Sequence, residues 1–348
     1  MSDTVKIAVI GAGVVGLSVA YQLTQQYGSR VDVTVVAETF IQQTTSFGTA
    51  GLWEPYAIAG TPDELLNRWG RLAFEHFRDE YVKPTCEKAG VQLMTAYNLF
   101  EEHQDDTPPS WSDIVFNFQR LTQEDIRKMG LPSRFVKGYT FGTYVVDQKY
   151  YLQYITKLLE EAGVKFVQRK VTNISDVTSD YECVINCCGL GSYSVANDKD
   201  MYPIRGQVLR IKAPWVKCIW FFGSSYIIPN VDNVVVGGTT QKGDWNTNIS
   251  LEDTKNILSK VADVFPAVAQ APIENIWVGL RPGRAPVRLD SESIRASSGK
   301  ETKVIHCYGH GGSGITLAMG CAQDVVQNHF STWFNQRKVQ DGSRLSNW

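Results

Sequence analysis

A glycine-rich turn near the start of the chain constrains the fold more than any other feature. It reads GAGVVG over residues 11–16. A short apolar run (6–10) precedes it, and a segment with helical spacing of apolar residues (14–27) follows. A second apolar run, 31–37, then ends at Glu38. Strand, glycine turn, helix, second strand and acidic residue, in this order and at this spacing, predict a βαβ unit that binds a dinucleotide.

Each part of this pattern has a physical role in holding a pyrophosphate. Gly11 permits a tight turn, Gly13 lets the backbone approach the phosphates, and Gly16 lets the helix pack closely on the strand. The phosphates then lie at the positive end of the helix. Glu38 is placed to bind a ribose hydroxyl. These features alone do not distinguish FAD from NAD.

Two further features favour FAD. The glycine turn opens the chain, and a second glycine-rich junction (309–314) lies near its end. This junction connects a predicted strand (304–307) to a long predicted helix (315–334). The amide end of that helix could stabilise the negative charge that a flavin ring gains on reduction.

Between these junctions the patterns change along the chain. Helices are predicted over 63–86 and 150–162, with strands at 165–167 and 183–187. Residues 203–240 carry several short runs rich in β-branched residues, separated by turns. Nucleotide-type pieces at the start, middle and end, with an antiparallel-looking insert, predict an α/β fold with interleaved domains.

Composition excludes several classes of partner. The net charge of −2 gives no basic excess for nucleic acid, and no apolar run is long enough to span a membrane. Seven cysteines, an odd number without a CxxC pair, predict neither a disulfide framework nor a metal site. The N-terminus leads directly into a strand, so we expect no secretory signal.

Seven segments, in order over nearly the whole chain, resemble the D-amino acid oxidase and D-aspartate oxidase family. They are GAGVVGLS (11–18), TTSFGTAGLWEPY (44–56), YPIRGQV (202–208), SSYIIP (224–229), GGTTQKGDW (237–245), GLRPGRAPVRL (279–289) and YGHGGSGIT (308–316).

The resemblance implies a Rossmann-type FAD-binding domain interleaved with a substrate domain on a large mixed β-sheet. The FAD-binding domain is expected to comprise residues 1–57, 140–195 and 295–340, and the substrate domain 58–139 and 196–294. It also implies a reaction in which a D-amino acid, O2 and water give a 2-oxo acid, ammonia and hydrogen peroxide. A peroxisomal location and a homodimer are implied as well, although Ser346-Asn347-Trp348 matches a Ser-Lys-Leu targeting signal poorly.

Four residues match substrate-binding positions of the family. Arg281 matches the arginine that grips the substrate carboxylate, and a planar guanidinium suits such bidentate binding. Tyr226 matches a tyrosine whose hydroxyl binds the same carboxylate, and the backbone carbonyl of Gly312 would accept the substrate ammonium. Tyr56 occupies the fourth position.

The resemblance also assigns residues to the cofactor. The expected FAD-binding residues are Gly11, Ala12, Gly13, Val14, Val15, Gly16, Glu38, Thr44, Thr45, Gly51, Leu52, Val171, Cys188, Gly189, Arg281, Gly309, Gly311, Gly312, Ser313, Gly314, Ile315 and Thr316. Gly51 and Leu52 would lie near the reactive flavin nitrogen. Hydride leaves the α-carbon for the flavin, so no acid–base residue is assigned, and His310, Arg284 and Arg288 are interpreted as structural.

The charge of the preferred substrate side chain is predicted from the absence of basic residues at three positions. A D-aspartate oxidase needs a positive partner for the side-chain carboxylate. The three positions where we look for one hold Tyr56, the apolar lid CIWFFGSS (218–225) and Thr240. This favours neutral or apolar D-amino acids. Lys242 could still reach an acidic substrate, although a solvated turn explains it more simply, and the lid is short, with Phe222 where a tyrosine is usual.

Four alternatives remain at this point. One is D-aspartate oxidase, and a second is glycine or sarcosine oxidation on the same scaffold. A third is an NAD-dependent dehydrogenase, whose purified protein would be colourless. The fourth is a flavin-binding module without redox activity, whose FAD no amino acid would bleach.

Overall fold

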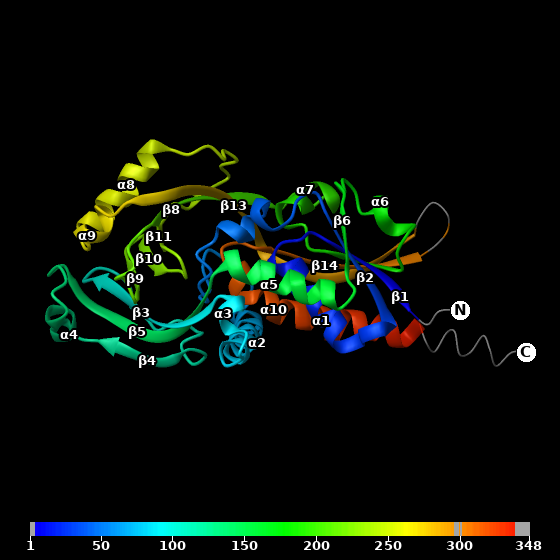
Figure 1. Cartoon of the computed structure of the whole chain (residues 1–348), viewed down its shortest axis with the longest axis horizontal. Helices are drawn as coiled ribbons and strands as arrows, with labels where there is room; N and C mark the ends of the chain where they lie inside the picture. The colour runs from blue at the N-terminus through cyan, green and yellow to red at the C-terminus, as the bar shows by residue number, and fades with distance from the viewer. Residues whose placement is uncertain (1–3, 296–298, 300, 338–348) are drawn as a thin grey trace, which may run out of the picture.

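A single twisted β-sheet runs through the protein, with helices packed along it (Figure 1). The computed structural model describes residues 4–295, 299 and 301–337. Within these residues the strands are β1 (Val5–Ile10), β2 (Val31–Ala37), β3 (Val91–Glu101), β4 (Phe116–Leu121), β5 (Phe135–Val146), β6 (Lys165–Gln168), β7 (Cys183–Asn186), β8 (Tyr202–Ile211), β9 (Ile219–Phe222), β10 (Ser225–Pro229), β11 (Val234–Gly237), β12 (Gln241–Lys242), β13 (Ile273–Arg295) and β14 (Glu301–His310). The helices are α1 (Val14–Tyr27), α2 (Asp63–Tyr81), α3 (Cys86–Ala89), α4 (Gln123–Lys128), α5 (Gln148–Glu161), α6 (Ser175–Thr178), α7 (Ser192–Val195), α8 (Leu251–Ala262), α9 (Pro266–Ala269) and α10 (Gly314–Asp324).

One half of the sheet is parallel and is covered on both faces. Its strands follow the order β14-β7-β1-β2-β6. On β1, Ile7 and Val9 belong to the core beneath α1 and α10, whereas Ala8 and Ile10 face a separate cluster beneath α6 and α7. Strands that are buried on both faces read as continuous apolar runs, which explains why 6–10 and 31–37 were recognisable in the sequence.

The other half is largely antiparallel; it contains the short strands expected within 203–240, together with β3, β4, β5 and β13, which the sequence patterns did not predict. β4, β5, β3, β9, β10, β11 and β8 lie in this order, and β13 joins them to β14. β13 escaped prediction over its full length because Pro282 and Pro286 interrupt it, and its register against β14 shifts between Gly283 and Arg288. In Figure 1 β8 and β13 extend from one half of the molecule toward the other.

Helix boundaries differ from expectation at two places. The helix that starts at Asp63 ends at Tyr81. A proline at position 84 disfavours helical backbone in the residue before it. At the other end of the chain, α10 begins at Gly314 and passes at Asp324 into a π-helical stretch, Val325–Phe330.

The mixed α/β fold with a large mixed sheet is confirmed, whereas the domain boundaries stay a prediction. Among the described residues, no helix combines the length and apolar character needed to cross a membrane. The tripeptide 346–348 lies outside the described residues.

Candidate active site

A cavity of about 820 Å³ reaches from the β1–α1 turn to the antiparallel half of the sheet. The first end is lined by residues 11–15 and Glu38, and the second by Tyr56, Tyr226 and Arg281. This volume lies at the upper end of the range for ligand-binding pockets, roughly 300–1,000 Å³. The cavity therefore has room for a large cofactor together with a small substrate.

The glycine turn opens the first end of the cavity. Gly11 has a φ of +106°, and a Cβ there would lie 2.5 Å from the carbonyl oxygen of Cys187, so a side chain has no space. α1 then starts at Val14, and its N-cap Gly13 gives no side-chain cap. The amide of Val14 donates to Ser46 Oγ at 3.0 Å. Residues 13–15 line the cavity, so the amide end of the helix is available to phosphate oxygens.

Glu38 lies at the same end, at the tip of β2. Its carboxylate forms an ion pair with Lys170 at 2.9 Å and remains largely solvent-accessible. Val171, Cys188 and Gly189, which the resemblance assigns to FAD, also line the cavity. A ribose hydroxyl would therefore meet a carboxylate whose position is fixed by a neighbouring cation.

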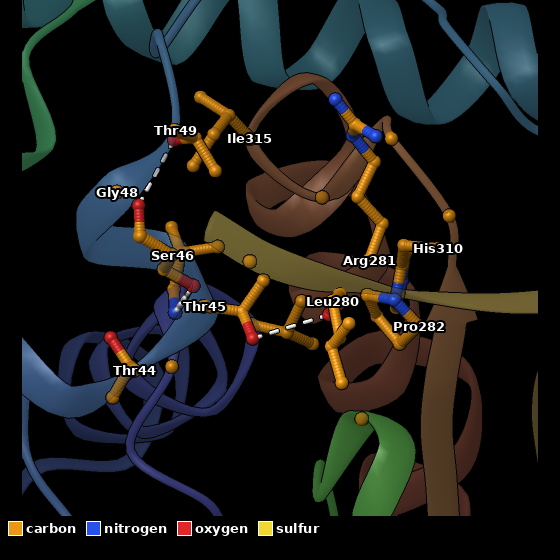
Figure 2. A pocket seen from close by; sticks show the side chains of 18 of the residues that line it. Thr44, Thr45, Ser46, Gly48, Thr49, Leu280, Arg281, Pro282, His310 and Ile315 are labelled. Atoms are coloured by element: carbon orange, nitrogen blue, oxygen red, sulfur yellow. Dashed lines mark hydrogen bonds between the residues drawn. The ribbon is translucent and has the colours of Figure 1, made fainter. Parts of the chain in front are cut away.

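The middle of the cavity is formed by the segment 44–56 and the start of α10. Thr45 Oγ1 donates to the carbonyl of Leu280 at 3.3 Å, which ties this segment to β13 (Figure 2). Figure 2 also shows Ile315, from the first turn of α10, beside Thr49. α10 has no side-chain cap and no acidic residue in its first turn, so its amide end presents partial positive charge to the cavity.

Most residues expected to bind cofactor line the cavity, but four do not. Those outside the lining are Gly16, Gly309, Ser313 and Thr316. A Cβ on Gly16 would lie 2.0 Å from the carbonyl oxygen of Gly11, so this glycine serves helix–strand packing. Ser313 Oγ accepts from the amide of Tyr56 and donates to its carbonyl, at 2.8 and 2.9 Å. Thr316 makes the corresponding pair of bonds with Glu54, at 3.1 and 2.8 Å.

Ser313 and Thr316 thus position the cavity wall rather than line it, which predicts a stability defect. Thr316→Val would leave the amide and carbonyl of Glu54 without this buried partner. We expect a loss of about 1–3 kcal/mol in the free energy of unfolding. Denaturant unfolding followed by tryptophan fluorescence measures it. Thr332→Val, which removes an exposed bond to the carbonyl of Asn328, is the control and should change stability little.

Arg281 lies on β13 at the second end of the cavity. Its Nη1 donates to the carbonyl of Thr239 at 3.1 Å. The guanidinium passes over Gly206 of β8, where a Cβ would lie 2.4 Å from Nη1, so only glycine leaves space for it. In Figure 2 the side chain of Arg281 extends away from His310 and Pro282. The guanidinium keeps donors free for a ligand because one backbone carbonyl occupies only part of its five N–H groups.

Two tyrosines accompany Arg281. Burial raises the pKa of Tyr226, and the positive charge of Arg281 opposes that rise. The hydroxyl therefore stays protonated and can donate a hydrogen bond. Tyr56 places its ring 5.7 Å from Cζ of Arg281, and its hydroxyl lies 2.6 Å from Thr240 Oγ1. These contacts bring Arg281, Tyr226, Tyr56 and Gly312 to one end of the cavity.

Other polar residues interpreted as structural have protein partners. Arg284 binds Asp198 at 2.8 Å, and Arg288 binds Asp290 at 3.1 Å. Lys242 places its amine 4.4 Å from the ring centre of Tyr202 and does not line the cavity. His310 does line the cavity; it is 2% exposed, and its Nε2 lies 4.0 Å from Cys307 Sγ.

Sequence reasoning missed several residues of the lining. These include Ser46, Glu54, Asn98, Phe100, Phe221 and Trp277. Phe221, rather than Phe222, faces the cavity, because Phe222 is buried in a separate core cluster. The signal for Glu54 was its place in the motif 44–56, midway between Leu52 and Tyr56, which the resemblance assigns to the site.

FAD fits this arrangement. Two helix N-termini whose N-cap residues provide no side-chain cap face one cavity, and the backbone of Cys187 approaches the first of them so closely that glycine is required at position 11. Glu38 stands at the distance along the chain that a ribose ligand requires. Residues 11–15 and Glu38 would hold the dinucleotide, and residues 44–52 and 311–315 would hold the flavin.

Comparisons with known proteins agree with this geometry. Residues 6–328 match the family model described as "FAD dependent oxidoreductase". The chain is 35% identical to a D-aspartate oxidase of Homo sapiens over 327 residues, covering 93% of this chain and 94% of that protein. It is 37% identical to a D-amino acid oxidase of Dugesia ryukyuensis, covering 92% and 96%. The crystal structure of a glycine oxidase from Bacillus cereus superposes with a TM-score of 0.73 at 22% identity, covering 93% and 95%.

Proposed function

The chain belongs to the FAD-dependent oxidoreductase family, and from this membership we propose that it is a D-amino acid oxidase. It would convert a D-amino acid, O2 and water to a 2-oxo acid, ammonia and hydrogen peroxide. The observation that carries the proposal is the meeting of Arg281 and Tyr226 at the end of the cavity away from the dinucleotide turn. A guanidinium beside a neutral phenol suits an α-carboxylate.

The protein's own residues would bind and orient the substrate. Arg281 holds the carboxylate, Tyr226 donates to the same group, and the carbonyl of Gly312 accepts from the amino group. Three fixed points around the α-carbon define which of its substituents faces the middle of the cavity. Bound FAD would supply the two-electron acceptor for the hydride of the α-carbon, with O2 as the final oxidant.

The side-chain preference follows from the charges around the cavity. Among the described residues, the lining contains two arginines and no lysine. One of the two, Arg169, lies at the dinucleotide end, where its amide donates to the carbonyl of Ala37. Arg281 would be occupied by the α-carboxylate, so a side-chain carboxylate would find no cation. We therefore propose a preference for D-amino acids without an acidic side chain.

D-Aspartate oxidase is the second candidate, because the human relative carries that name. Oxygen consumption with D-alanine, D-aspartate, glycine and sarcosine separates the candidates. The proposal expects D-alanine to be oxidised faster than D-aspartate, and glycine and sarcosine slowly. A clear preference for D-aspartate would overturn the argument from missing cations.

A homodimer and a peroxisomal location are part of the proposal as well.

Tyr226→Phe tests the second carboxylate contact. Removing the hydroxyl leaves the ring packed against Gly237 and takes away one donor to a charged group. We expect kcat/KM for D-alanine to fall about tenfold, mostly through KM, since a hydrogen bond to a charged group contributes roughly 1.5–3 kcal/mol. Steady-state kinetics measures this. An unchanged KM would show that the hydroxyl does not touch the substrate.

A further inference from the structure

Glu54 is a carboxylate at the substrate end of the cavity that the proposed function does not use. It lies in a segment whose residues Leu52, Glu54 and Tyr56 line the cavity, while Trp53 is fully buried. The backbone of this segment is held from both sides: the amide of Trp53 donates to the carbonyl of Tyr144 at 2.9 Å, and Thr316 binds the backbone of Glu54. The backbone of Glu54 is therefore fixed at the cavity wall.

The surroundings of Glu54 are largely apolar and provide no counter-charge. Asn98 and Phe221 lie side by side on β3 and β9, and both line the same cavity as Glu54. Asn98 directs its amide to the hydroxyl of Tyr139 at 2.8 Å. No ion pair among the described residues includes Glu54. Burial raises its pKa to about 8, which is the behaviour of a carboxyl group without a cation nearby.

Glu54 lies two residues before Tyr56, which packs beside the carboxylate anchor. Both residues line the cavity, and Ser313 and Thr316 bind their backbones. The ring of Tyr56 is in turn 5.7 Å from Cζ of Arg281. An amino acid whose α-carboxylate binds Arg281 would thus have Glu54 within reach of a long side chain.

From this juxtaposition we propose that Glu54 forms the side-chain subsite for D-amino acids with a cationic side chain, such as D-arginine and D-lysine. A guanidinium or ammonium entering the cavity would provide the positive charge that pairs with the Glu54 carboxylate. The side chain of Phe221 would pack against the methylene groups. The inference rests on the proposed oxidase activity and refines its preference from neutral substrates to basic ones. Glu54 would bind the substrate side chain and so determine which D-amino acids are preferred, without contacting the reacting atoms.

D-Arginine and D-citrulline test this directly, because they share chain length and shape and differ in the charge of the terminal group. We expect kcat/KM for D-arginine to exceed that for D-citrulline by about tenfold or more, as for other close pairs of buried charges. Glu54→Gln keeps the size of the side chain and should reduce the ratio to about one, mainly by lowering kcat/KM for D-arginine. D-Lysine and D-norleucine form a second matched pair.

Each outcome bears on one claim. A ratio near one in the native holoenzyme, or a ratio that Glu54→Gln leaves unchanged, would overturn the subsite while D-alanine is still oxidised. If no D-amino acid is oxidised, the proposed function itself fails. The ratio in the native enzyme needs no variant, so a folding defect in Glu54→Gln would not remove the test.

The ratio should also depend on pH. A carboxyl group with a raised pKa becomes charged as the pH increases through about 8, whereas the D-arginine side chain stays charged throughout. The ratio is therefore expected to be larger at about pH 9 than at about pH 6, and Glu54→Gln should abolish the difference. A difference that persists in the variant would contradict this origin. The other titratable groups facing this end are Tyr56, Tyr226, Arg281 and His310, with Tyr139 behind Asn98.

Discussion

Replacing Arg281 with alanine is expected to lower kcat/KM for every D-amino acid about 100- to 1,000-fold while FAD stays bound. The substrate carboxylate would enter an end of the cavity where, among the described lining residues, no other cation is placed to bind it. Truncating one partner of a buried, hydrogen-bonded charge pair costs about 2–5 kcal/mol. FAD retention is expected because the dinucleotide contacts lie at the other end of the cavity.

The measurement combines the visible absorbance of the purified protein with the rate of flavin reduction under anaerobic conditions. Lys242→Ala is the matched control, because Lys242 is a cation in a neighbouring strand that lies over Tyr202 and outside the cavity lining. It should retain near-normal reduction. Near-normal turnover of Arg281→Ala would show that the carboxylate anchor is elsewhere.

Gly11→Ala is expected to produce protein with little or no FAD and reduced stability. A φ of +106° is unfavourable for any residue with a Cβ, and the added atom would lie 2.5 Å from the carbonyl oxygen of Cys187. The turn must shift, which displaces the amides of residues 13–15 from the phosphate site. We expect a loss of about 3 kcal/mol or more from the combined backbone and steric terms. The ratio of flavin to protein absorbance and the thermal midpoint measure the two effects.

Gly163→Ala separates the backbone penalty from the steric clash. Gly163 has a φ of +83°, and a Cβ there would meet no atom within 4 Å, so the variant carries the backbone penalty without the clash. It should lose about 1–2 kcal/mol and keep its FAD. Equal loss of FAD in both variants would mean that the glycine turn does not hold the cofactor.

Local signals explain how much of this molecule was predictable. The cofactor end depends on short-range features, because a glycine turn, a buried strand and a helix start are contiguous in sequence. Gly11, Val14 and Glu38 were expected to bind the cofactor on these features, and all three line the cavity. Parallel strands buried on both faces also leave an unmistakable apolar pattern.

The substrate end of the cavity was harder to predict from the sequence, because its geometry is produced by long-range strand pairing. Phe221 meets Asn98 through the pairing of β9 with β3, which no local pattern encodes. Glu54 lies inside the segment 44–56, within which the resemblance assigns other residues to the site. Its place on the cavity wall depends on the pairing of Leu52 and Trp53 with the end of β5, which is again long-range.

Anaerobic mixing of the purified protein with D- and L-amino acids tests the central claim most directly. The account predicts that the protein is yellow as isolated and that D-alanine and D-arginine bleach the flavin band, whereas their L-enantiomers leave it unchanged. A colourless protein, or a yellow one that no D-amino acid bleaches, would contradict it.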